Sequence, residues 1–155
     1  MRNGSFVVAL LAAFALLAGL DWLPASPVQD GAAAHAARGT PEPTRLAIVW
    51  TSGDPDVAHR MTLMYAGAAK RNGWFEEVRL VVWGPSQRLV VADKDVRAYI
   101  ERLIEGGVVV EACLACADSY GIAEDLRAIP GVEVRYMGGP VSEFLKSEEW
   151  EVVTF

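Results

Sequence analysis

The chain has 155 residues, which is enough for one domain with its own core and too few for two of ordinary size. Its net charge is −6, so it lacks the basic field that attracts nucleic acid or anionic lipid headgroups. We therefore predict no nucleic-acid partner. The sequence holds only two cysteines, and they lie three residues apart.

The amino-terminal part of the chain has the layout of an export signal. Arg2 precedes an apolar run from Phe6 to Leu20, and a polar stretch rich in Ala and Pro follows. The run is short for a membrane span, which needs about 18 or more residues. We predict a signal peptide or membrane anchor over residues 1–23, a flexible linker over 24–44 and one domain over 45–155. The domain is expected to be periplasmic or secreted, with membrane contact only through an uncleaved anchor.

Short strand-like segments, rich in β-branched and aromatic residues, recur along the predicted domain. They are Leu46–Trp50, Val78–Trp83, Val108–Cys113, Val132–Met137 and Trp150–Phe155. The first and third are almost wholly apolar, as expected for central parallel strands that are covered on both faces. The fourth alternates between apolar and polar residues, so we expect it either to have one wetter face or to lie toward an edge of the sheet.

Helix-like periodicity fills the intervals between these segments. Asp54 and Pro55 signal the start of the first helix, in which apolar residues share one face. These residues are Val57, Met61, Met64, Tyr65 and Ala68. The segment Ser86–Ala92 is ambiguous between a short helix and an extended stretch. A second helix is predicted between Asp93 and Gly106-Gly107.

A third helix is predicted from Ala115 to Ala128, and a short fourth one follows Pro140. The alternation of strands and helices predicts an α/β fold, namely a three-layer α/β/α domain with a mainly parallel five-stranded sheet. Such sheets carry their functional sites at the carboxyl ends of the strands. Three loops meet this condition: Thr51–Asp54, Gly84–Ser86 and Cys113–Cys116.

The two cysteines are the strongest candidates for chemistry. Cys113 is predicted to end the third strand, and Cys116 to lie in the first turn of the next helix. The free N–H groups and the positive dipole end of a helix start favour a thiolate, which is the nucleophilic form. Simple packing is the alternative, because cysteine is among the most buried residue types.

If the thiols are reactive, disulfide exchange and sulfur transfer both fit a Cys-x-x-Cys pair. A metal site would need more ligands than this pair supplies, and His59 is the only histidine of the predicted domain. We therefore predict no metal site. No phosphate-binding Gly-rich motif, paired carboxylates or serine triad stands out, so no cofactor is predicted either.

Six residues of the other two loops are candidate pocket residues: Ser52, Gly53, Asp54, Gly84, Pro85 and Ser86. For Asp54, capping of the first helix is the simpler explanation. Gly53 and Gly84 serve tight turns, and Ser86 fits a turn or cap equally well.

Several motifs together resemble a known family. They are Ser52-Gly-Asp-Pro, Trp83-Gly-Pro-Ser, the segment from Gly107 to Ile122, Met137-Gly-Gly-Pro, Leu145-Lys and Val153-Thr-Phe. Because these motifs occur together and in this order, the chain from Leu46 to Phe155 resembles the DsrE/DsrF-like proteins, small α/β domains of sulfur-relay systems. The resemblance implies a parallel five-stranded sheet, assembly into trimers or hexamers, and a sulfur-accepting cysteine after the third strand.

In the relay members, the accepting cysteine is followed eight residues later by a glycine. Cys113 and Gly121 match this spacing, so the resemblance carries the acceptor role to Cys113. Cys116 stands where those members have no cysteine, and it is either a resolving thiol or without a role. The relay members work in the cytoplasm, whereas this chain begins with an export-like segment, which leaves the specific activity open.

We therefore expect an exported, oligomeric, sulfurtransferase-like carrier. It would accept sulfane sulfur as a persulfide on Cys113 and pass it to a partner protein. Two alternatives stay open: a thiol–disulfide redox protein that uses Cys113 and Cys116, and a non-catalytic oligomeric binding module with inert thiols.

Overall fold

The computed structural model describes residues 44–155, so the predicted signal or anchor and nearly all of the predicted linker lie outside the described residues. The described strands form one parallel sheet in the order β4-β3-β2-β1-β5. They are β1 (Arg45–Trp50), β2 (Glu77–Val82), β3 (Val109–Cys113), β4 (Val132–Arg135) and β5 (Trp150–Thr154). The parallel sheet is as predicted, and β4 lies at an edge, which is one of the two alternatives expected for it.

Helices connect successive strands. They are α2 (Pro55–Val57), the π-helical turn η1 (Ala58–Thr62), α3 (Leu63–Arg71), α4 (Pro85–Ala92), α5 (Lys94–Glu105), α6 (Leu114–Tyr120), α7 (Ala123–Arg127) and α8 (Gly138–Lys146). The ambiguous segment Ser86–Ala92 is therefore helical. None of the helices described between residues 44 and 155 has the length and apolar character that a membrane crossing requires.

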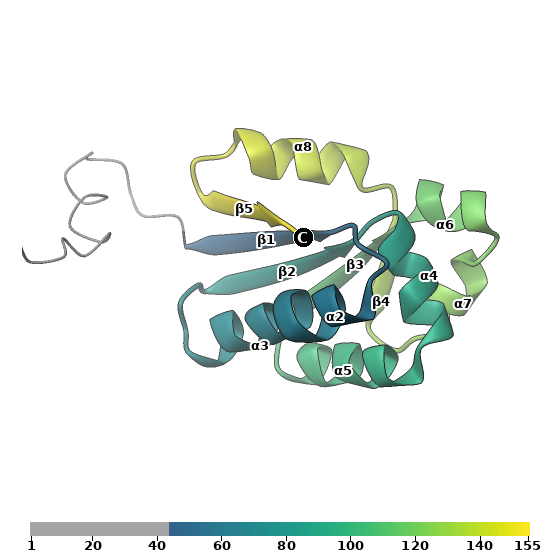
Figure 1. The fold of residues 1–155 in the computed structure, drawn as a ribbon. Coiled ribbons are helices and arrows are strands. Elements are labelled where there is room, and N and C mark those ends of the chain that lie inside the picture. The colour runs from purple at the N-terminus through teal and green to yellow at the C-terminus, as the bar shows by residue number, and fades with distance from the viewer. Residues whose placement is uncertain (1–43) are drawn as a thin grey trace, which may run out of the picture. The chain divides into compact units, whose positions relative to one another are not determined.

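The strand order determines which helices cover which face of the sheet. From β1 to β4 the chain steps in one direction, so right-handed crossovers place α3, α5 and α7 on the same face. The last crossover returns across the sheet to β5, which places α8 on the opposite face (Figure 1). The result is the predicted three-layer α/β/α arrangement, with α8 as the third layer.

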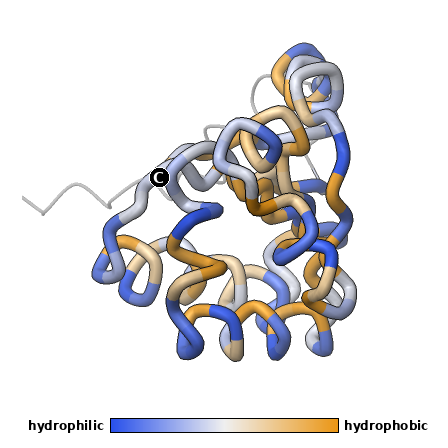
Figure 2. The backbone as a smooth tube through the Cα atoms, turned by 90° about the vertical axis from the view of Figure 1, so that its right-hand side faces the viewer, coloured by the Kyte–Doolittle hydropathy of each residue, from blue (hydrophilic) through white to orange (hydrophobic). Residues whose placement is uncertain are grey.

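The two faces of the sheet differ in how they are packed. The larger hydrophobic cluster lies under α3, α5 and α7 and includes Ile48, Leu80 and Val110. The smaller cluster lies under α8 and includes Val141 and Phe144. Figure 2 shows hydrophobic and hydrophilic positions alternating along the helices, as expected for elements that pack on one side and face water on the other.

The first helical segment does not present the face that the periodicity predicted. Met61 and Met64 are 49% and 52% exposed, whereas Ala58, Ala66 and Ala69 are fully buried. The π-helical turn explains the difference, because its wider turn rotates the residues after it relative to a 3.6-residue repeat. The small alanine side chains then face the sheet.

The predicted third helix is two helices in the structure. Gly121 has φ of 68° and ends α6, and α7 starts two residues later. A left-handed residue stops the helical hydrogen-bond ladder, and glycine adopts that conformation without steric cost. The apolar pattern of this segment predicts Ile122, Leu126 and Ile129 on the inner side. Leu126 and Ile129 are buried and Ile122 is half-buried, although the helix is interrupted.

Candidate functional site

The candidate site lies at the carboxyl end of the sheet, where β3 and β4 end side by side. Cys113 of β3 pairs in register with Arg135 of β4. After β3 the chain turns to α6 on one face, and after β4 it turns to α8 on the other. Connections that leave neighbouring strands toward opposite faces open a crevice between them, which is the usual ligand position in parallel sheets.

The first turn of α4 ties the ends of three strands together. The Ser86 hydroxyl donates to the carbonyl oxygen of Trp50, which ends β1, at 2.7 Å. The Gln87 Nε2 group donates to the carbonyl oxygen of Val82 at 3.0 Å and to that of Cys113 at 2.9 Å. Ser86 and Gln87 are both fully buried. Their hydrogen bonds thus fix the backbone of Cys113 relative to the ends of β1 and β2.

The loop after β1 is organised by its own side chains. The Asp54 carboxylate accepts hydrogen bonds from the N–H groups of Asp56 at 2.7 Å and Val57 at 3.4 Å, so it caps α2. The Ser52 hydroxyl accepts one from the N–H of Asp54 at 3.2 Å. A Cβ on Gly53 would lie 3.4 Å from the Cβ of Pro85, which shows that this loop packs against the start of α4.

Gly84 provides the turn from β2 into α4. Its φ of 68° and ψ of −131° are open to glycine and strained for other residues. Pro85 follows at the first helical position, where no N–H is needed. The predicted pocket residues are thus brought together, but Ser52, Asp54 and Ser86 are occupied by local hydrogen bonds.

Cys113 is a free thiol at the amino-terminal cap position of α6 and is only 4% exposed. It belongs to the cluster beneath α8, together with Val81, Met137 and Phe144. Its side chain accepts no capping hydrogen bond from the helix. The sulfur is therefore placed at a helix start, as predicted, and is enclosed by apolar side chains.

Cys116 is also a free thiol and is half-buried in the first turn of α6. The pKa of this thiol is raised from its ordinary value of 9.0, first by burial and then by the Cys113 thiol within hydrogen-bonding reach. The backbone N–H of Gly84 and the side chain of Trp83 act in the opposite direction and do not outweigh burial. The Cys116 thiol is thus protonated at neutral pH.

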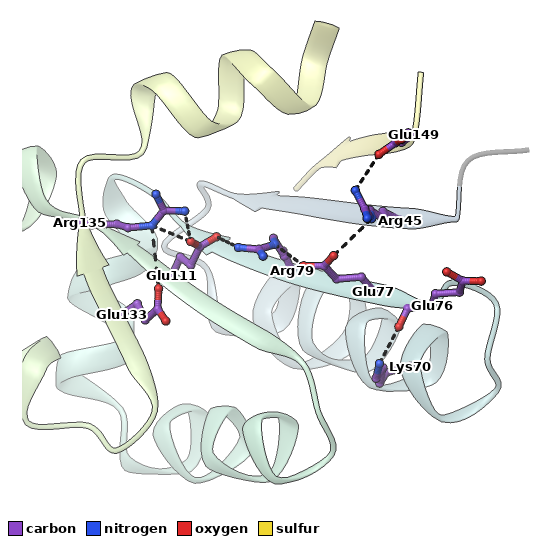
Figure 3. Close-up of polar contacts among 9 residues, drawn as sticks. All are labelled: Arg45, Lys70, Glu76, Glu77, Arg79, Glu111, Glu133, Arg135 and Glu149. Atoms are coloured by element: carbon purple, nitrogen blue, oxygen red, sulfur yellow. Dashed lines mark hydrogen bonds and ion pairs between the residues drawn. The ribbon is translucent and has the colours of Figure 1, made fainter. Parts of the chain in front are cut away.

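A row of ion pairs crosses the sheet on the side that α8 covers in part (Figure 3). Its centre is Glu111 of β3, two residues before Cys113, whose side chain is fully buried. Arg79 pairs with one carboxylate oxygen of Glu111 at 3.2 Å, and Arg135 binds the other through Nε at 2.8 Å and through its terminal nitrogen. Two guanidinium groups therefore compensate the carboxylate nearest to Cys113 along the strand.

The row continues on both sides of Glu111. Arg79 also pairs with Glu77 at 2.6 Å, and Arg45 contacts Glu77 at 3.5 Å and Glu149 at 2.7 Å. The alternation of charges thus spans the sheet from the start of β5 to β4.

A hollow of about 370 Å³ lies elsewhere, between the end of α5 and the start of β4, and is lined by Glu101, Ile104, Glu105, Pro130 and Gly131. These residues belong to the amino end of the sheet, away from the cysteines. Among residues 44–155, no group of three or more His, Cys, Asp or Glu side chains is arranged to hold a metal ion.

Two site residues were not predicted from the sequence. Gln87 holds the carbonyl oxygen of Cys113, and Trp83 lies beside Cys116. Trp83 was read as the last strand residue, but β2 ends one residue earlier. Gln87 lay in the segment whose structure was ambiguous. The signal for Gln87 that the sequence offered was a polar residue in the first turn after a strand and its loop.

Comparison with known proteins agrees with this geometry. The model of the DsrE/DsrF-like family matches residues 44–155. Among solved structures, a conserved protein of unknown function from Bacteroides thetaiotaomicron, BT1422, is 33% identical, with a TM-score of 0.68 over 72% of this chain and 95% of that one. The YchN protein of E. coli is 21% identical, with a TM-score of 0.60 over 72% and 99%.

No curated protein matches the chain at a significant level. The family match includes all five strands, the first turn of α4 and both cysteines. The first of the two solved structures is similar to this chain in sequence as well as in fold. On these grounds, the chain is a member of the DsrE/DsrF-like family.

Proposed function

We propose that this protein carries sulfane sulfur, and that Cys113 accepts the sulfur atom as a persulfide. DsrE-like proteins are associated with sulfur relay in general. The observation that carries the proposal is the position of Cys113, which ends β3 at the point where the chain leaves β3 and β4 toward opposite faces of the sheet. Gly121, eight residues later, ends the helix that Cys113 begins, which matches the spacing of the relay members.

The surroundings of Cys113 suit a bound sulfur atom. A persulfide is a soft, polarizable group, and Met137 and Phe144 provide an apolar enclosure on the α8 side. An anionic persulfide would be repelled by a free carboxylate on the same strand. Arg79 and Arg135 compensate Glu111, so this repulsion is reduced.

The transfer itself needs no cofactor. A donor persulfide, R–S–SH, gives its outer sulfur to the Cys113 sulfur: the donor S–S bond breaks, Cys113–S–SH forms, and the donor sulfur takes up the Cys113 proton and leaves as the thiol R–SH. The gain of one sulfur atom by the protein equals the loss by the donor. We include in the proposal that the domain is exported, forms a homo-oligomer and hands the sulfur to a partner protein. The apolar run from Phe6 to Leu20 supports export.

The experiment is mass spectrometry of the folded protein after treatment with a small-molecule persulfide. The variant Cys116→Ser, which keeps one thiol, is expected to gain the mass of one sulfur atom on the peptide that contains Cys113. The variant Cys113→Ser is the matched comparison and is expected to gain none at that position. An unmodified Cys113 thiol in folded Cys116→Ser protein would overturn the proposal.

A further inference from the structure

The second thiol of the pair is not needed by a one-cysteine carrier, yet the fold places it beside the first. Cys113 and Cys116 stand at the cap position and in the first turn of α6, where residues three apart lie on the same side of the helix. The Cys113 thiol is one of the groups that raise the pKa of Cys116. Cys113 belongs to the hydrophobic cluster beneath α8, and Cys116 packs against that cluster. They are the only cysteines of the chain.

We propose that Cys116 is a resolving thiol that releases the sulfur bound to Cys113 as sulfide. This step rests on the proposed function, because it begins from the Cys113 persulfide. The Cys116 sulfur attacks the inner sulfur of Cys113–S–SH, the S–S bond of the persulfide breaks, and a Cys113–Cys116 disulfide forms. The outer sulfur leaves as hydrosulfide, which takes up the Cys116 proton to become hydrogen sulfide. The sulfane sulfur gains two electrons and the two cysteines lose two, so the step needs no external oxidant.

The difference in burial favours an internal thiol over an external one. Cys113 is 4% exposed, so it is less accessible to the thiol of a second protein than to a small persulfide donor. Cys116 packs against the same apolar cluster and is half-buried, so it can approach Cys113 from within the fold. An intramolecular attack of this kind has a high effective concentration.

Before Cys113 binds sulfur, the raised pKa of Cys116 keeps the pair in the dithiol form. The raised pKa of Cys116 keeps this thiol protonated at neutral pH and limits its reaction with external electrophiles. Once Cys113 carries the outer sulfur, the leaving group is hydrosulfide, which has a lower pKa than an ordinary thiol and departs more readily. A dithiol reductant would return the disulfide to two thiols and permit another cycle.

The experiment follows the products of a single turnover without oxygen. Reduced protein is mixed with a small-molecule persulfide, and both intact mass and released sulfide are recorded over time. The native protein is expected to lose the mass of two hydrogen atoms and to release one equivalent of sulfide per chain. Cys116→Ser and Cys116→Ala are expected to stop at the Cys113 persulfide and to release none. Without the donor, the native protein is expected to keep two thiols.

The exposed neighbour Ala115 supplies a matched control in the same turn, and Ala115→Ser is expected to form the disulfide as the native protein does. A stable persulfide on the native protein, with no sulfide released, would overturn the inference and leave the proposed carrier function intact. If Cys113 takes up no sulfur even in the folded Cys116 variants, both fail. Sulfide release from the Cys116 variants equal to that of the native protein would also overturn the inference.

Discussion

At Cys116, burial and the backbone dipoles of a helix start act on the sulfur atom in opposite directions. The sequence predicted the helix start, and on that basis a thiolate was favoured. At Cys116, burial and the neighbouring Cys113 thiol outweigh the Gly84 N–H, so the pKa rises instead. The degree of enclosure by α8 decides this balance, and it cannot be read from local spacing.

The raised pKa of Cys116 gives a prediction for its reactivity. With Cys113 replaced by serine, the alkylation rate of Cys116 at pH 7–8 is expected to be lower than that of an unfolded control peptide. The rate should increase as the pH passes above the ordinary value of 9.0. The measurement is the pH profile of iodoacetamide labelling, read by mass spectrometry. Faster labelling in the folded variant than in the peptide at neutral pH would contradict it.

The same shift affects stability in a defined direction. The folded state holds the Cys116 proton more tightly than the unfolded state, because the folded pKa is the higher one. This contribution is fully present below the unfolded pKa and is lost as the pH rises through the folded pKa. In native protein the free energy of unfolding should therefore fall above about pH 9 by more than in Cys116→Ala.

Gln87 is predicted to be the polar residue on which the local backbone geometry depends most. Gln87→Met keeps the volume but removes the donor to the carbonyl oxygens of Val82 and Cys113. Two buried acceptors lose a partner, so we expect a loss of about 2–4 kcal/mol in the free energy of unfolding, measured by urea denaturation. The neighbour Arg88 lies over the Tyr120 ring on the surface, and Arg88→Met should cost about 1 kcal/mol or less. Equal costs for the two variants would contradict this assignment.

At the scale of elements, the strands were easier to predict than the helices. Each strand is a run of β-branched and aromatic residues between turns, and such runs are visible without knowledge of the tertiary structure. The π-helical turn η1 and the break at Gly121 depend instead on which side chains the sheet accepts. The apolar pattern of residues 115–129 is continuous across Gly121, so periodicity alone predicted one helix.

The break at Gly121 leads to a prediction about α6. Gly121→Ala places a side chain at φ of 68°, which is expected to cost about 1–2 kcal/mol. The loss should show as a lower midpoint of urea unfolding and as faster amide hydrogen exchange in α6. Gly138→Ala is the matched control, because Gly138 begins α8 without a positive φ and has open space around it. That variant should be neutral or more stable by up to about 1 kcal/mol. A Gly121 variant as stable as the Gly138 one would contradict the strained-turn argument.

At the scale of the whole molecule, the sequence predicted the layers but not the strand order. The alternation of strands and helices predicted a parallel sheet with helices on both faces, which the structure confirms. That β4 lies beside β3 while β5 lies beside β1 depends on long-range packing. Only this order shows that the chain leaves β3 and β4 toward opposite faces, next to Cys113. The sequence therefore predicted the loop that bears Cys113, but not the burial of Cys113 under α8.

The ion-pair row across the sheet also becomes visible only with the strand order known, and it gives an asymmetric prediction. Removing Glu111 leaves Arg79 and Arg135, whose side chains are 25% and 44% exposed and can still be hydrated. Removing both arginines leaves a carboxylate that has no exposure and no compensating charge. We expect Arg79→Met combined with Arg135→Met to cost about 3–5 kcal/mol in the free energy of unfolding, and Glu111→Gln to cost clearly less.

The measurement is urea denaturation at neutral pH, with Arg60→Ala as the reference for an exposed pair. Arg60 and Asp56 are 80% and 83% exposed, so breaking their ion pair should cost about 0.5 kcal/mol or less. A Glu111 variant less stable than the double arginine variant would mean that the arginines, and not the carboxylate, bear the penalty of burial. In that case the compensation that we invoke beside the Cys113 persulfide would lose its physical basis, because Glu111 would not need the two guanidinium groups.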